Sequence, residues 1–402
     1  MPIALLALAI ASFGIGTAEF VMMGLLPEVA ADLHVSIPAA GGYISLYALG
    51  VVIGAPVLTL LGLRARRKTT LLSLLALFVV GNLFSVFAVS HESLLAARFV
   101  TGLPHGAFYG MGTVVAAGLV PAERRGRAIA TVFLGLTIAN IVGVPVGTQI
   151  GAAFGWRWAF AVVAVIGVIA LAAVAALVPR QPKPTGVSVR GELGAFRRPQ
   201  VWLSFGVVAF GFAAIFSFFS YIKPVLTDVT GFSATAVTPL LAVFGVGMTA
   251  GTALGGRLAD RSPLKTLYAG ISALAVSLAV FALTAQNPVM ASVMVFLIGA
   301  TAFTAIPSIQ ARILDQAEDA PAMGSASIHS AFNIANSLGA YLGGAVIAAG
   351  FGMVAPSWVG VLLALVGLGF AVLSGRLDRR SRRHETVAHR PVHATEPELS
   401  DV

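Results

Sequence analysis

The sequence predicts an all-α membrane protein with twelve transmembrane helices in two pseudo-symmetric six-helix halves. Of its 402 residues, 58% are hydrophobic and only 10% are charged, which is more apolar surface than a soluble protein of this length could bury. Windows of roughly 20 residues divide the chain into about twelve apolar stretches, each long enough to cross a bilayer. The longest polar stretch before the C-terminal tail falls between the sixth and the seventh of them.

The expected spans follow one another closely along the chain. The first six lie at about residues 3–27, 39–62, 69–89, 94–119, 128–152 and 158–178, and the last six at about 201–225, 236–257, 265–285, 289–311, 323–350 and 354–374. The first stretch is longer than a signal peptide and lacks a basic start, so we expect it to be retained. The chain contains no cysteine, which excludes disulfides, thiolate metal sites and cysteine nucleophiles.

Basic residues predict the orientation in the membrane. Of the 25 Lys and Arg residues, 22 lie in alternate connections or in the tail, which places both termini in the cytoplasm under the positive-inside rule. The net charge of +9 therefore reflects topology and not nucleic-acid binding. We expect an N-terminal half at 1–179, a cytoplasmic linker at 180–200, a C-terminal half at 201–375 and a disordered cytoplasmic tail at 376–402.

The two halves repeat one another. A shift of 197 positions places Tyr47, Gly50 and Gly54 on Phe244, Gly247 and Gly251, and a shift of 196 places Asn140, Gly143 and Gly147 on Asn336, Gly339 and Gly343. Duplicated halves around a site at the membrane midplane are a recurring plan of transporters, in which one half rocks against the other.

Glu19 is the most unusual residue, because it is a carboxylate inside the first apolar stretch. A charge near the centre of a bilayer costs at least ~2.5–3.5 kcal/mol, so acids in such positions usually face a bundle interior and have a function. No other carboxylate lies so deep in an apolar stretch, and the repeat places Phe216 at the equivalent position. We expect Glu19 to handle protons or cations; the alternative is a structural hydrogen bond to a neighbouring helix.

The fourth span carries polar residues on one face. Arg98, His105 and Tyr109 fall at i, i+7 and i+11, and Arg98 is placed to pair with Glu19 because both lie in the outer halves of their spans. One alternative is that Arg98 snorkels to the membrane interface. We expect His105 and Tyr109 to line the substrate cavity as well; for His105, the alternative is a hydrogen-bonded packing residue.

Aromatic and polar residues elsewhere predict a substrate cavity. Phe212, Phe216 and Phe219 recur at helical spacing in the seventh span, as a stacking wall for a planar substrate or as lipid-facing aromatics. In the eleventh span, His329 and Asn333 share a face and serve either a cavity or interhelical hydrogen bonding. The remaining residues predicted to line the cavity are Phe13, Gly16, Phe20, Met23 and Tyr47.

The connection between the eighth and ninth spans carries a motif. It reads Gly-Arg-Leu-Ala-Asp-Arg-Ser-Pro-Leu-Lys, with motif residues at Gly256, Asp260, Arg261 and Lys265. This run resembles the cytoplasmic loop signature of the major facilitator superfamily. An Asp near a helix end can pair with Arg and latch one state of a rocking motion; the alternative is an ordinary basic loop. The first-half copy has Arg64 and Lys68 but carries Leu63 where the acid should be.

Three further motifs resemble the same family. The fourth span resembles the family's fourth-helix motif, whose Arg is associated with proton transfer in drug antiporters. The fifth span resembles its antiporter motif, with Asn140, Gly143, Pro145 and Gly147, although Val144 separates the usual Gly-Pro pair. The first span matches through the run Gly-Thr-Ala-Glu-Phe that contains Glu19. The resemblance covers all twelve spans and points to the drug:proton antiporter branch, among bacterial arabinose, purine-nucleoside and chloramphenicol efflux permeases.

The resemblance implies a secondary active transporter of the bacterial inner membrane that exports a drug, sugar or nucleoside in exchange for protons. Glu19 would take a proton facing outward and release it facing inward as substrate binds. We expect a monomer whose partners are the lipid bilayer, its substrate and protons, without cofactor, metal or nucleic acid. An uncoupled facilitator or importer on the same fold is the main alternative. A membrane-embedded enzyme is disfavoured, because no span pairs a nucleophile with a base. A non-transporting receptor, which would bind a ligand without flux, is also disfavoured.

Overall fold

The structure, a computed structural model, describes residues 3–63, 65–121, 124–181, 199–316 and 321–388. Every regular element in these ranges is helical, as expected where a segment inside a bilayer must hydrogen-bond its own backbone. Eleven helical stretches within these ranges are long and apolar enough to cross a membrane. The remaining predicted span is α4 (His91–Gly118), a helix of 28 residues whose polar side chains make it less apolar than the others.

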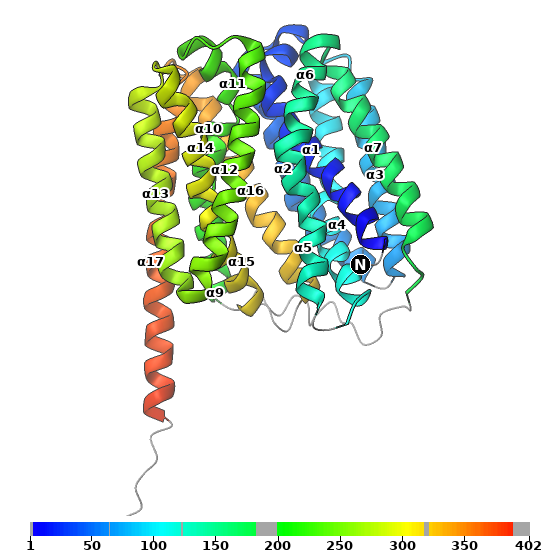
Figure 1. Ribbon diagram of the computed structural model, residues 1–402, viewed down its shortest axis with the longest axis vertical. Helices are drawn as coiled ribbons and strands as arrows, with labels where there is room; N and C mark the ends of the chain where they lie inside the picture. Colours follow the sequence, from blue (N-terminus) through cyan, green and yellow to red (C-terminus); the bar gives the residue numbers. More distant parts are fainter. Residues whose placement is uncertain (1–2, 64, 122–123, 182–198, 317–320, 389–402) are drawn as a thin grey trace, which may run out of the picture.

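Each predicted span coincides with one helix or with consecutive helical segments. The first half contains α1 (Ala4–Asp32), α2 (Ile37–Gly62), α3 (Arg67–Val86), α4, the run α5 (Arg125–Ile138), η2 (Ala139–Gly143) and α6 (Val144–Phe154), and α7 (Trp156–Leu177). The second half contains α9 (Pro199–Gly211), α10 (Ala213–Phe219), α11 (Ile222–Pro224), η4 (Val225–Val229), α12 (Ala234–Arg261), α13 (Pro263–Thr284), α14 (Pro288–Thr304), α15 (Ile306–Gln316), α16 (Pro321–Ala348) and α17 (Ala355–Ala388). The first half, blue to teal, lies beside the second, green to red (Figure 1).

The two ends of the bundle differ in charge. The N-terminus and the basic connections α2–α3 and α12–α13 lie at the lower end in Figure 1, which we call the basic end. The connections α1–α2, α3–α4 and α13–α14 lie at the opposite end. α17 continues past residue 376, where we expected the tail to begin, and ends at Ala388. The Arg-rich sequence there favours helix, while residues 389–402 and most of the predicted linker, 182–198, lie outside the described residues.

The seventh predicted span is interrupted, where the sequence suggested one stretch from 201 to 225. The helix breaks after Gly211 and again at Ser220 and Tyr221, and it ends in the π-helical segment η4. Gly211 weakens a helix and Pro224 cannot donate a backbone hydrogen bond, which accounts for two of these irregularities. Because the helix is broken at the boundary between the halves, its side chains point in directions that a straight helix would not allow.

The internal repeat is visible in the packing of glycines. A side chain at Gly54 would collide with the backbone of Leu103 on α4, and one at Gly251 with the backbone of Ala300 on α14. Leu103 and Ala300 are themselves separated by 197 positions, the shift that relates the two glycines. The same close contact between helix backbones is therefore built once in each half, which is what the duplicated plan predicts.

We predict that Gly251→Ala destabilises the protein, whereas Gly256→Ala on the same helix does not. The added methyl group meets backbone at Gly251 and nothing within 4 Å at Gly256. Overpacking of this kind costs about 1–3 kcal/mol, while Gly to Ala in an open helical position is neutral or slightly stabilising. Thermal unfolding of the two variants in detergent measures the difference. Equal unfolding temperatures would contradict this account of the α12–α14 contact.

Candidate functional site

Glu19 lies in the middle of α1, where the two halves meet. Only 6% of the residue is exposed, and Oε1 accepts a hydrogen bond from Nδ2 of Asn336 on α16, 3.4 Å away. Small residues let α1 come this close to its neighbours, since a side chain at Gly16 would collide with α5 and one at Gly24 with α6. The carboxylate thus touches the second half while its helix packs tightly into the first.

Arg98, fully buried on α4, is held near Glu19 by backbone carbonyl groups. Its Nη1 donates to the carbonyl oxygen of Ala18 at 2.9 Å and its Nε to that of Tyr43 at 3.3 Å. The guanidinium carbon lies 4.3 Å from the centre of the Tyr47 ring. Glu19 and Arg98 interact electrostatically, but both hydrogen bonds of the arginine go to carbonyl oxygens and not to the carboxylate. Protein encloses the side chain, so it does not snorkel to the end of the bundle.

A layer of rings lies on the basic side of this pair. The Tyr47 hydroxyl and His105 Nδ1 are 3.0 Å apart, and the His105 ring is 5.6 Å from the ring of His329 on α16. His329 stacks on Tyr109 with ring centres 4.5 Å apart and planes 14° from parallel. The Tyr109 hydroxyl lies 2.8 Å from Ser12 Oγ on α1. Four predicted cavity residues, from α2, α4 and α16, therefore meet Ser12 of α1 where the halves touch.

The predicted aromatic wall of the seventh span packs across the boundary. Phe216 stacks near Phe20 of α1 at 6.4 Å and 10°, and Phe219 meets the same ring edge-on at 6.3 Å. Phe219 also stacks on Phe244 of α12 at 4.0 Å. Phe212 is 2% exposed, and these aromatics face the inside of the protein and not the lipid.

The remaining predicted cavity residues take separate positions. Met23 is fully buried, and Phe13 is half-buried beside Gly143. Asn333 donates to the carbonyl oxygen of His329 on its own helix at 3.0 Å, and its Oδ1 has no hydrogen-bond partner in the described part of the chain. In the described part of the chain, none of these three residues forms a hydrogen bond with Glu19.

The fifth-span motif forms the π-helical segment between α5 and α6. Asn140 and Gly143 belong to η2, and Pro145 and Gly147 begin α6. A side chain at Gly143 or at Gly147 would collide with α1. The motif therefore lets the fifth span lie directly against the helix that carries Glu19.

The loop motif between the eighth and ninth spans lies at the basic end. Gly256, Asp260 and Arg261 are in the last turns of α12, and Lys265 is in the first turn of α13. Asp260, Arg261 and Lys265 are exposed. Within the described ranges no ion pair holds Asp260, so the predicted latch stays a prediction.

The first-half copy of the motif is described only in part. Lys68 Nζ donates to the carbonyl oxygen of Ala175 on α7 at 2.6 Å, which ties two helices of the same half together. Arg64 lies outside the described residues. The contact of Lys68 does not reach the second half, and it offers no latch between the halves.

Sequence reasoning missed an ion pair that joins the halves at the end opposite the basic end. Lys223 of α11 donates to Oε1 of Glu28 on α1, and the lysine side chain is 3% exposed against 26% for the glutamate. Nearby, the Tyr221 hydroxyl donates to the carbonyl oxygen of Ala340 on α16 at 2.7 Å. The sequence did contain a signal for this pair: Lys223 lies inside an apolar stretch and outside the alternate basic connections. We assigned no partner to this lysine.

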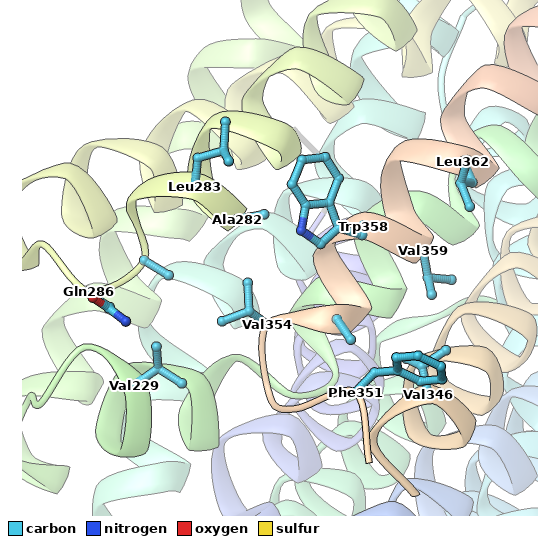
Figure 2. Close-up of a pocket in the computed structure, with 12 residues that line it drawn as sticks. Val229, Ala282, Leu283, Gln286, Val346, Phe351, Val354, Trp358, Val359 and Leu362 are labelled. Atoms are coloured by element: carbon cyan, nitrogen blue, oxygen red, sulfur yellow. The ribbon is translucent and has the colours of Figure 1, made fainter. Parts of the chain in front are cut away.

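A separate cavity of about 630 Å³ lies in the second half, away from Glu19. Its lining comes mainly from the ends of α13, α16 and α17, and none of the twelve lining residues is charged (Figure 2). Leu283, Phe351 and Leu362 on its rim are more than half exposed, so it opens to the outside of the bundle. The polar residues that could handle a proton do not line this cavity.

Comparison with known protein families agrees with this geometry. The family profile described as Major Facilitator Superfamily matches residues 8–340. The chain belongs to this family. It is therefore a multi-pass membrane transporter and not an enzyme.

Known relatives and a solved structure cover nearly the whole chain. The inner membrane transport protein YdhP of Escherichia coli is 42% identical over 92% of this chain and 96% of its own length. A chloramphenicol resistance protein of Streptomyces lividans is 33% identical over 92% and 95%. The fold matches a crystal structure of a bacterial homologue of the human lysosomal transporter Spinster, with TM-score 0.73 and 16% identity over 93% and 96% of the two chains. The predicted all-helical fold of this superfamily is confirmed.

Proposed function

We propose that the protein exports a small organic molecule in exchange for protons and that Glu19 carries the proton. One observation supports this most strongly: a carboxylate with 6% exposure lies between the two halves, near Arg98 of one half and bonded to Asn336 of the other. An acid in such a position is costly unless it has a function. Because its partners come from both halves, a change in its charge acts on their separation.

The proposed cycle uses this dependence. When the halves part around Glu19, its contact with Asn336 is lost and the carboxylate meets water and takes up a proton. The neutral acid is enclosed again as the halves close. On the other side of the membrane, substrate binding favours the form that has released the proton. Protonation and substrate thus bias the same two-state equilibrium in opposite directions, which is antiport by alternating access.

In the proposed orientation, the basic end faces the cytoplasm of a bacterial cell, as the positive-inside rule requires. The Lys223–Glu28 pair then lies on the periplasmic side, where it joins the halves. This arrangement corresponds to a state closed toward the periplasm. Substrate would reach the ring layer from the cytoplasm, which is the direction that export needs.

The test is substrate-driven proton movement in proteoliposomes that contain a pH-sensitive dye. We expect that addition of a transported compound, from a panel of sugars, nucleosides and antibiotics, moves protons in the direction opposite to the compound. Liposomes without protein supply the baseline. Transport of a compound with no accompanying proton movement would instead identify an uncoupled facilitator and overturn the proposal.

A further inference from the structure

Three rings lie parallel at the boundary between the halves. Tyr109 of α4 and Phe133 of α5 are 5.4 Å apart and 10° from parallel. The ring of His329 on α16 lies 4.5 Å from Tyr109 and 6.0 Å from Phe133, with angles of 14° and 7°. Two stacked rings of the first half thus form an aromatic platform, and the second half places a third, parallel ring against it.

The platform is preorganised by its surroundings. The Tyr109 hydroxyl interacts with Ser12 Oγ at 2.8 Å and donates to the Ser12 carbonyl oxygen at 3.2 Å, and Tyr109 is fully buried. Phe133 is half-buried, so part of its ring is accessible at the boundary. A rigid aromatic surface binds with less loss of conformational entropy than a flexible one.

The stack crosses a boundary that has to open if the halves rock. When α16 moves away, His329 leaves and exposes the faces of Tyr109 and Phe133. Planar rings are the ligands that such faces bind best, because offset stacking adds to the burial of apolar area. We propose that Tyr109 and Phe133 bind the planar aromatic or heteroaromatic ring of the substrate, and that His329 occupies the same place when substrate is absent. This inference rests on the proposed transport function and names its substrate class.

The ring platform is connected to the proton site. Ser12 and Glu19 are seven residues apart on α1, as are His329 and Asn336 on α16, which separates the two layers by about 10 Å. Between them, His105 lies 5.2 Å from the Tyr109 ring and bonds the Tyr47 hydroxyl, whose ring underlies Arg98. A ring that displaces His329 would therefore disturb α16 two turns from the amide that bonds Glu19.

The chemistry of the platform selects among the compound classes under consideration. A purine nucleoside or a nitrophenyl antibiotic presents a planar ring, while a sugar such as L-arabinose does not. Hydroxyl and imidazole groups at Ser12, Tyr109 and His105 supply donors and acceptors for polar substituents. Within the described residues, the hydrogen bonds and ring contacts of these three side chains involve no carboxylate, and Glu19 interacts with Tyr109 only electrostatically.

The test is equilibrium dialysis of the purified full-length protein in detergent with radiolabelled adenosine, chloramphenicol, ethidium and L-arabinose. We expect at least one of the three planar compounds to bind and L-arabinose not to bind. Phe133→Leu should weaken that binding by about two- to tenfold, since an aromatic pair is worth about 0.5–1.5 kcal/mol. Phe133→Tyr keeps the ring and should bind like the wild type.

Phe210→Leu is the matched control, because Phe210 stacks on Phe370 at 5.5 Å and 7° in the second half, between α9 and α17. It should leave binding unchanged. Failure of all three planar compounds to bind, binding of arabinose alone, or full binding by Phe133→Leu would overturn the ring platform. If Phe133→Leu does not fold, Phe133→Tyr supplies the test, and a loss of binding of about two- to tenfold in that variant would also overturn the ring platform. Binding is measured without a proton gradient, so planar compounds that bind but move no protons would refute the coupling and leave the platform standing.

Discussion

Replacing Glu19 with glutamine is expected to abolish uphill transport while downhill exchange of substrate continues. Glutamine resembles the protonated acid in shape and can still bond Asn336, but it has no proton to release. A gradient of two pH units can sustain a substrate ratio of about 100 for each proton exchanged, since one unit corresponds to about 1.4 kcal/mol. In the variant, this ratio should fall to about one. Substrate uptake into proteoliposomes with and without an imposed pH gradient measures both quantities.

The matched control for this prediction is Glu92→Gln. Glu92 lies exposed in the first turn of α4, and its substitution makes the same chemical change away from the boundary between the halves. Its accumulation ratio should equal that of the wild type. Uphill accumulation by Glu19→Gln would show that another group carries the proton.

Lys223→Met is expected to loosen the contact between the halves at the end opposite the basic end. The substitution leaves Glu28 without its partner, and breaking a buried pair in this way costs about 3–5 kcal/mol. Because the glutamate side chain is 26% exposed, a smaller cost is expected. About 1.4 kcal/mol would already change the ratio of closed to open forms tenfold.

The chain contains no cysteine, so one introduced thiol reports this opening. Ser337→Cys places it on α16, where the Ser337 hydroxyl donates to the carbonyl oxygen of Ser45 across the boundary at 3.3 Å. Its reaction with a maleimide should be about tenfold faster when Lys223→Met is also present. When Glu28→Gln is added to Lys223→Met, the introduced cysteine should react more slowly than with Lys223→Met alone, because no charge is then left unpaired.

Arg157→Met is the matched control for the loss of a cation. Arg157 pairs with Asp32 at 2.7 Å within the first half and at the same end of the bundle. Its loss should leave the labelling rate of Ser337→Cys unchanged. If Ser337→Cys reacted with the maleimide equally fast with and without Lys223→Met, the ion pair would not hold this boundary closed.

The spans were predictable because each follows from one local property, an apolar run of about 20 residues. The duplicated glycines were predictable for a similar reason, since only a residue without a side chain fits where two helix backbones touch. The breaks in the seventh span were not. Gly211 and Pro224 could be seen, but their effect depends on the helices packed beside them, which are α13 and α17 at Gly211 and α1 at α11.

The candidate site was predictable only as far as single helices carry it. Arg98, His105 and Tyr109 share a face by spacing alone, and Glu19 stands out by its charge. Phe133 was missed because it is an apolar residue on an apolar helix, and only its stacking on Tyr109 distinguishes it.

Pairings between the halves escape sequence reasoning for a related reason. Glu28 and Lys223 lie 195 positions apart, and nothing local in either segment names the other. Arg98 illustrates the same limit at shorter range. We expected it to pair with Glu19; the two charges interact electrostatically, but the hydrogen bonds of Arg98 go to the backbone carbonyls of Ala18 and Tyr43. The sequence identifies charged groups, and the packing decides which atoms they meet.

Proton release on substrate binding tests the central claim most directly. Purified protein in weakly buffered detergent solution, with a pH indicator, receives saturating amounts of a transported compound at constant temperature. We predict release of about one proton per protein molecule by the wild type and none by Glu19→Gln, because substrate favours the deprotonated form of this one carboxylate. Equal release by the two proteins, or none by either, would contradict the assignment of Glu19 as the proton carrier.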